Sequence, residues 1–282
     1  MSVESLPLAV ALCFLLIASL IDFKTREVPD TLNFGLLSFA IGYRLILSLV
    51  TMDYMPLVEG AAGFIAFFIL ALIMFYAGQW GGGDSKMLMA LGALVGIPIV
   101  LDIPLLLHFI VNVVFFGALW GFLFAIVKAL LNRKEFNKEF KKIFHKTKVM
   151  FFIAMAIFIA LIVVVFIIEE PLLKLFFILL AIMAPLMYSL FAFTHAVEKS
   201  CMHVWLKPNK LTLGDWIVKD IKHKGKLIAS KKDLGLTEEQ IAKIKKLKIK
   251  KVLVKEGIPF VPSFFIAFVV TICAGSFISI VL

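Results

Sequence analysis

Long apolar segments alternate with short polar ones along this chain, and they restrict its possible folds more than any other feature. Eight segments reach or approach the roughly 20 residues that a helix needs to cross a bilayer. Of the 282 residues, 62% are hydrophobic, whereas soluble domains are about half apolar. The sequence therefore predicts a polytopic α-helical membrane protein with about eight transmembrane helices. The expected spans are residues 6–21, 33–50, 57–77, 87–100, 104–127, 149–168, 172–194 and 261–282, the fourth being the shortest.

The distribution of charge predicts how these spans are oriented. All lysines and arginines except Arg44 and Lys174 lie in the connections after the first, third, fifth and seventh spans. Cytoplasmic loops carry such an excess, so we expect a multi-pass plasma-membrane protein with basic loops in the cytoplasm and both termini outside. The first span lacks a preceding basic segment and a following cleavage site, so we expect it to be retained. The net charge of +10 then fits contact with anionic lipid and not with nucleic acid.

The pattern divides the chain into five parts. Residues 1–127 form a membrane core of five spans, 128–148 a basic cytoplasmic helical segment, 149–194 two further spans, 195–260 a small basic cytoplasmic α+β domain, and 261–282 the final transmembrane helix. In the small domain we expect strands at 215–221, 226–230 and 249–254. A helix over 236–247 should begin with a capping box between Thr237 and Gln240.

Small residues predict which spans pack closely. Gly92 and Gly96 form one pair four residues apart, Gly117 and Gly121 form another, and 60–63 open the third span with small residues. The span at 149–168 has no glycine and is bulky on every side. We expect it at the lipid-facing periphery.

Two aspartates stand at the ends of spans. Asp84 follows Gly81, Gly82 and Gly83 at the start of the fourth span, and Asp22 ends the first. Each can be explained as a residue that starts or ends a helix. However, two spans separate them, so both lie at the same membrane surface. Paired carboxylates there can share the work of a protease, because one activates water while the other, protonated, hydrogen-bonds the scissile carbonyl.

This chemistry requires neither a metal nor a cofactor, and we expect none. The cysteines Cys13, Cys201 and Cys273 form no Cys-x-x-Cys pair. The glycines would supply backbone conformations closed to other residues and room for the Asp22 loop or an extended substrate beside Asp84.

The sequence resembles a known family at these positions. Gly81-Gly82-Gly83-Asp84 matches the Gly-x-Gly-Asp motif of intramembrane aspartyl proteases, and residues 21–30, IDFKTREVPD, resemble the first-aspartate motif of type IV prepilin peptidases. The resemblance covers about 6–127, and 255–268 also resemble the start of the final helix in archaeal members. It implies that Asp22 and Asp84 are catalytic, with Gly81 and Gly83 as supporting motif residues. The implied substrates are pilin-like or archaeal flagellin precursors, cleaved on the cytoplasmic side between a short basic leader and a hydrophobic helix.

The chain also departs from that family. Bacterial members carry paired cysteines in an amino-terminal cytoplasmic loop, linked to N-methylation, and this chain has none. It resembles the archaeal, peptidase-only type, so we do not infer methyltransferase activity. Preflagellin and other prepilins both stay open as substrates, although the long carboxyl-terminal half favours a prepilin.

Several other polar residues received more modest interpretations. We expect Arg44 to extend toward the outer face, and His108 and Asn112 to hydrogen-bond between helices. Asp53 and Asp102 lie on the face opposite the proposed pair and are excluded from it. Glu27 and Asp30 are the acids nearest the pair in sequence and could hold a basic leader, although they could equally offset local basic residues and cap the second span.

Two other classes of protein use intramembrane carboxylates. A proton- or cation-coupled transporter could use Asp22 and Asp84, but such proteins often carry broken helices in both halves, and the second half has no match here. Presenilin-like proteases combine Gly-x-Gly-Asp with Tyr-Asp and Pro-Ala-Leu motifs, and neither occurs in this chain.

Overall fold

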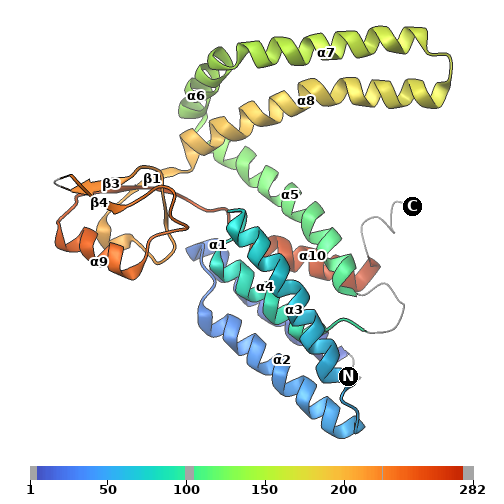
Figure 1. The fold of residues 1–282 in the computed structure, drawn as a ribbon, viewed down its shortest axis with the longest axis vertical. Coiled ribbons are helices and arrows are strands. Elements are labelled where there is room, and N and C mark those ends of the chain that lie inside the picture. Colours follow the sequence, from blue (N-terminus) through green and yellow to red (C-terminus); the bar gives the residue numbers. More distant parts are fainter. Residues whose placement is uncertain (1–4, 99–104, 224, 276–282) are drawn as a thin grey trace.

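The computed structural model describes residues 5–98, 105–223 and 225–275, which form helices and a small sheet region (Figure 1). Over these residues, every predicted span is a helix. Six are long and apolar enough to cross a membrane: α1 (Ser5–Thr25), α2 (Asp30–Thr51), α3 (Met55–Tyr76), α5 (Leu105–Leu131), α7 (Lys148–Ile167) and α8 (Pro171–Cys201). The helices α4 (Gly82–Val95) and α10 (Val261–Ala274) are shorter. The predicted polytopic helical membrane protein with a small α+β domain is confirmed.

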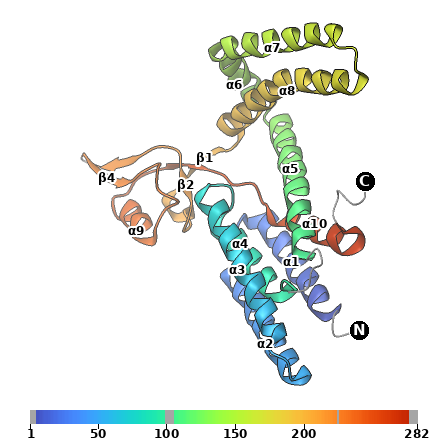
Figure 2. The ribbon, with the colours of Figure 1, turned by 45° about the vertical axis from the view of Figure 1, so that its right-hand side comes forward.

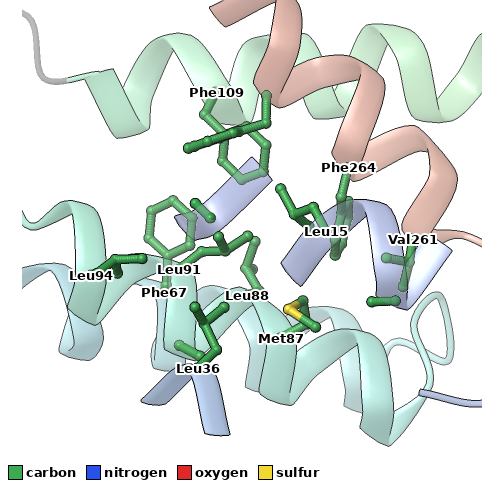
Figure 3. Close-up of a cluster of buried hydrophobic side chains, with 14 of the residues drawn as sticks. Leu15, Leu36, Phe67, Met87, Leu88, Leu91, Leu94, Phe109, Val261 and Phe264 are labelled. Atoms are coloured by element: carbon green, nitrogen blue, oxygen red, sulfur yellow. The ribbon is translucent and has the colours of Figure 1, made fainter. Parts of the chain in front are cut away.

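The short helix α4 lies inside the bundle and packs against α2 and α3. Most of its residues are buried, and α1, α5 and α10 complete the surrounding core. Figure 3 shows side chains from these core helices, α1 to α5 and α10, meeting there. Among them are Leu15, Leu36, Phe67, Leu91, Phe109 and Phe264. A helix buried on this scale is held chiefly by its apolar contacts.

Glycine allows the backbones of α3 and α4 to touch. A Cβ on Gly63 would collide with the carbonyl oxygen of Gly92, and a Cβ on Gly92 would collide with that of Gly63. Gly96 ends α4 with a positive φ of 73°, and its N–H donates to the Gly92 carbonyl. The predicted packing role of Gly92 is confirmed.

Of the second glycine pair, Gly117 and Gly121, only Gly117 lies at a close packing contact within the described bundle. Gly117 packs against the ring of Phe260, just before α10. Among the described residues, no atom lies within 4 Å of a Cβ built on Gly121. The prediction that Gly121 packs against another helix is therefore wrong, because it lies on a part of the α5 surface that the described bundle leaves open.

The helices α7 and α8 form a hairpin that diverges from this core (Figures 1 and 2). Within the described residues only Ala154 of α7 is buried, which confirms the peripheral position of that span. The basic segment forms α6 (Arg133–Lys146), which packs on α8 through ring contacts such as Phe136 with Phe193 and Phe144 with Tyr188. The hairpin meets the core near its base, where α5 contacts the end of α8.

The small domain follows α8. Its three-stranded antiparallel sheet has the order β1–β5–β2, built from β1 (His203–Leu206), β5 (Val252–Lys255) and β2 (Trp216–Ile217). A short 3₁₀ helix (Pro208–Lys210) follows β1, and β3 (Ile221–His223) pairs with β4 (Lys226–Ala229) as a hairpin. Helix α9 (Glu238–Lys246) covers a core that includes Ile244 and Val254.

The expected capping box is present, because the Thr237 N–H donates to Gln240 Oε1 at 2.9 Å and the Gln240 N–H donates to Thr237 Oγ1 at 3.3 Å. The expected strand at 215–221 is divided between β2 and β3. The strand β1, four residues that follow α8, was not predicted from the sequence.

Candidate active site

Asp22 lies in the last turn of α1, and its side chain is buried. Its Oδ2 accepts a hydrogen bond of 3.0 Å from the N–H of Val261, the first residue of α10. The N-terminus of a helix carries free N–H groups and partial positive charge, both of which favour a carboxylate. The contact joins residues 239 positions apart in the chain. Helix α10 is therefore part of the Asp22 environment, which was not predicted from the sequence.

Asp84 occupies the first turn of α4 and is partly buried. Its Oδ2 accepts a hydrogen bond of 3.1 Å from the N–H of Gly81. The helix cap is Gly81 and Asp84 is the third residue of α4, so the alternative that Asp84 itself caps the helix is wrong in position. Its side chain nevertheless satisfies one N–H at the start of the helix. The oxygen that performs this structural task is Oδ2.

The fold brings the two carboxyl groups to the same end of the bundle. They are close enough that the charge on Asp22 acts on Asp84. The hydrogen bonds just described hold each one separately, Asp22 through Val261 and Asp84 through Gly81. Each carboxyl group thus has a backbone donor of its own.

Of the three glycines before Asp84, Gly83 allows a close approach of another segment. A Cβ on Gly83 would lie 3.2 Å from Val28 Cβ and 3.3 Å from the Val28 N and O atoms, which belong to the loop after Asp22. None of Gly81, Gly82 and Gly83 has a positive φ, so the expectation of a conformation closed to other residues is wrong. Gly83 is favoured at this position because it has no side chain, which leaves room for the backbone of Val28.

Asn33 is a further residue of this contact that the sequence analysis did not single out. It is buried in the second turn of α2, and its Nδ2 donates to the Gly83 carbonyl at 3.2 Å. The available signal was an amide side chain close to the start of an expected transmembrane span. Asn33 ties the start of α4 to the start of α2.

The two acids proposed for leader recognition differ in the structure. Both Glu27 and Asp30 are exposed on the Asp22 side of the bundle. Asp30 forms an ion pair with Lys86 Nζ at 2.6 Å. The Glu27 carboxylate lies near that of Asp215 in the small domain, so that their charges interact. The contact with Lys86 gives Asp30 a local partner, whereas a neighbouring acid makes the surroundings of Glu27 more negative.

Arg44 contradicts its sequence interpretation. Its side chain does not extend to the surface but is buried, with Nη2 donating to the carbonyls of Leu94, at 3.0 Å, and Val95. Nη1 also pairs with Glu59 at 3.4 Å. The short helix α4 ends inside the bundle and leaves its last carbonyls unbonded, so a buried cation there is favourable.

Two other polar interpretations can be compared with the structure. Asn112 forms the expected interhelical hydrogen bonds, to Thr271 Oγ1 at 2.9 Å and to the Gly275 carbonyl at 2.8 Å. Asp53 accepts a hydrogen bond from the Met55 N–H at the start of α3. Asp102 lies outside the described residues.

The comparison with known proteins concerns the segment that holds both aspartates. Residues 9–131 match the type IV leader peptidase family. The predicted resemblance to this family is thereby confirmed for these residues. The matched segment runs from α1 to α5, whereas the small domain and α10 lie beyond it.

Individual relatives of the type IV leader peptidase segment are archaeal. The preflagellin peptidase of Methanococcus maripaludis is 43% identical over 81 residues, which is 29% of this chain and 35% of that protein. Those of Methanocaldococcus jannaschii and Methanococcus voltae are 41% identical over 81 residues and 39% over 87, covering 29% and 31% of this chain. The alignments thus span only 34% to 37% of each relative. No solved structure gives a significant match.

Proposed function

We propose that this chain is a membrane aspartyl endopeptidase that removes the short basic leader of preflagellin or pilin-like precursors. The observation that carries the proposal is the position of Asp22 and Asp84, which lie at one end of the bundle within electrostatic reach, inside the segment that matches type IV leader peptidases. The names of the three relatives favour preflagellin as the substrate. The long carboxyl-terminal half still favours a prepilin.

In the proposed mechanism the two aspartates divide one reaction between them. One, ionised, takes a proton from a water molecule held between the pair, and the resulting hydroxide attacks the scissile carbonyl carbon. The other, protonated, donates a hydrogen bond to the carbonyl oxygen and stabilises the negative charge that develops there. The tetrahedral intermediate then breaks its C–N bond as a carboxyl proton passes to the leaving amine. The backbone N–H groups of Val261 and Gly81 hold the carboxyl groups in place.

The charge pattern supports cytoplasmic cleavage. The small basic domain and the basic α6 follow the same ends of the spans as the aspartate loops, and we assign this side to the cytoplasm. Both termini then lie outside. In this arrangement, residues 1–127 are the catalytic core, and the parts beyond it are accessory to that core.

The test is cleavage of purified precursors by the purified protein, with sequencing of the new amino terminus of the product. Asp22→Asn and Asp84→Asn should each reduce cleavage by at least about a thousandfold while the protein still inserts into membranes. The double variant should be no worse than either single variant, because residues that act as a unit are not additive.

Substantial cleavage by either single variant would remove that residue from the proposed role. A wild-type protein that cleaves neither precursor but carries protons or cations across vesicles would favour the transporter instead.

A further inference from the structure

The segment from β5 to α10, residues 256–261, is fastened along its length to the end of the bundle that holds Asp22. It crosses this end beside the small domain in both views (Figures 1 and 2). The Gly257 carbonyl accepts from Arg26 Nη1 at 2.8 Å, and the Pro259 carbonyl accepts from Trp120 Nε1 at 2.8 Å. The last contact is the hydrogen bond from the Val261 N–H to Asp22.

Glu256 is the charged centre of this segment. Its Oε1 lies 3.2 Å from Arg26 Nη1, and its Oε2 lies 2.9 Å from Lys128 Nζ at the end of α5. Its own N–H donates to the Met202 carbonyl at 2.7 Å, directly after α8. One side chain therefore joins the loop after α1 to α5, while its backbone is anchored at the start of the small domain.

Arg26 shows why the loop needs such a partner. It has a φ of 61°, in the left-handed region that residues with a side chain rarely adopt. Its N–H donates to the Asp22 carbonyl at 2.7 Å, and α1 ends at the preceding residue, Thr25, one turn after the aspartate. Its guanidinium also lies over the ring of Phe124, 5.5 Å from the centroid. A disfavoured turn persists only when surrounding contacts hold it, and Glu256 supplies the opposite charge.

The small domain also contacts the loop before Asp84. The ring of Trp216 in β2 lies against Gly78, where a Cβ would come within 2.7 Å of it. Gly78 has a φ of 68° and ends the turn after α3. The small domain and the linker thus contact both loops that adjoin the proposed aspartate pair, the loop after α1 and the loop before α4.

We propose that Glu256 is a positioning residue for Asp22, and that through it the small domain sets the geometry of the aspartate pair. The inference rests on the proposed function for its catalytic consequence, but the contact itself can be tested without catalysis. Glu256 lies outside the family-matched segment and touches neither proposed carboxylate, so it acts through Arg26, Lys128 and the linker.

Hydrogen–deuterium exchange of the full-length protein in detergent tests the contact. Glu256→Gln keeps the size of the side chain and removes its charge, so backbone amides in 24–30 and 258–262 should exchange about tenfold faster. Amides in the buried part of α4 should keep their wild-type rates. Glu239→Gln makes the same change at an exposed position of α9 and should alter neither region. Glu256→Asp, which keeps the charge, should exchange at rates between those of the wild type and Glu256→Gln.

Peptidase kinetics on the same variants test the catalytic consequence. Glu256→Gln should lower kcat about tenfold and leave KM nearly unchanged, since a displaced catalytic group costs rate more than substrate binding. Unchanged exchange in 24–30, or equal effects of Glu256→Gln and Glu239→Gln, would overturn the proposal. Faster exchange with unchanged kcat would overturn the positioning role. A wild-type protein without peptidase activity refutes the proposed function instead, and exchange still decides whether Glu256 holds the Asp22 loop.

Discussion

At the scale of single residues, neighbours of the same type have different surroundings in the proposed site. Gly82 and Gly83 are consecutive, yet a Cβ on Gly82 meets no described atom within 4 Å, whereas one on Gly83 meets the backbone of Val28. Glu27 lies in the loop before α2 and Asp30 is the first residue of that helix, yet of these two acids only Asp30 forms an ion pair within the described residues. Such differences arise from tertiary contacts, and each yields a comparison between two variants.

Gly83→Val should reduce kcat/KM for a precursor by at least about a hundredfold, because a branched side chain would separate the Asp84 helix from the Asp22 loop. Gly82→Val makes the same change at the open position and should cost less than about threefold. Steady-state cleavage assays measure both. Equal, small effects would mean that the glycine triplet is only a tolerant linker.

Glu27→Gln should raise KM about two- to fivefold for a precursor with a basic leader, which is the range of an exposed charge pair. A leader whose basic residue is replaced by Gln should show no such change. The difference should shrink in high salt, since exposed charges are screened over about 10 Å at 0.1 M. Asp30→Asn is the matched control and should have less effect, because Asp30 already pairs with Lys86. If both leaders respond equally, leader recognition lies elsewhere.

At the scale of elements, α4 is unusual because it ends within the bundle. Its 14 residues are fewer than a full crossing needs. Gly96 ends the helix, and the Arg44 guanidinium fills the space against its last carbonyls. Because α4 ends inside the bundle, its last carbonyls need a buried donor, and the Arg44 guanidinium supplies it.

Arg44→Met should lower the free energy of unfolding by about 2–4 kcal/mol, because it leaves buried carbonyls and Glu59 without their cation. Titration with a denaturing detergent, followed by loss of helical signal, measures this quantity. Arg133→Met removes an exposed arginine at the start of α6 and should cost less than about 0.5 kcal/mol. Equal stability of the two variants would show that the buried guanidinium contributes nothing.

At the scale of the whole molecule, the number of crossings and the basic loops together predict the side of the membrane on which the aspartate pair lies. The small domain follows α8 on the same side as the aspartate loops and contacts them through Trp216 and Glu256. The proposed cytoplasmic cleavage therefore depends on the predicted orientation of the protein in the membrane.

Cysteine labelling in intact cells tests the orientation. In a background without the native cysteines, Lys24→Cys, Lys138→Cys and Lys232→Cys should resist a membrane-impermeant thiol reagent, whereas Asp53→Cys and Glu169→Cys should react. All five positions are exposed in the protein, so burial cannot explain a lack of reaction. Reaction at Lys232→Cys from outside would reverse the orientation and exclude cytoplasmic cleavage.

The sequence by itself determined the features that depend on local pattern or on counting. Apolar length predicted the spans, the pairing of Thr237 with Gln240 predicted a helix start, and two intervening crossings put Asp22 and Asp84 at one surface. The three features follow from short-range chemistry or from the number of crossings. None of them requires knowledge of how the helices pack.

Only the tertiary structure decided which groups surround the aspartates. The donor to Asp22 comes from Val261, on a helix 239 positions away, and Arg44 meets the end of α4 and not the outer face. Gly83 is required by the approach of Val28, although its backbone conformation is ordinary. Hydropathy records whether a segment prefers lipid to water, but it does not specify which helix faces which. These partners are set by packing among many helices at once, which no single segment encodes.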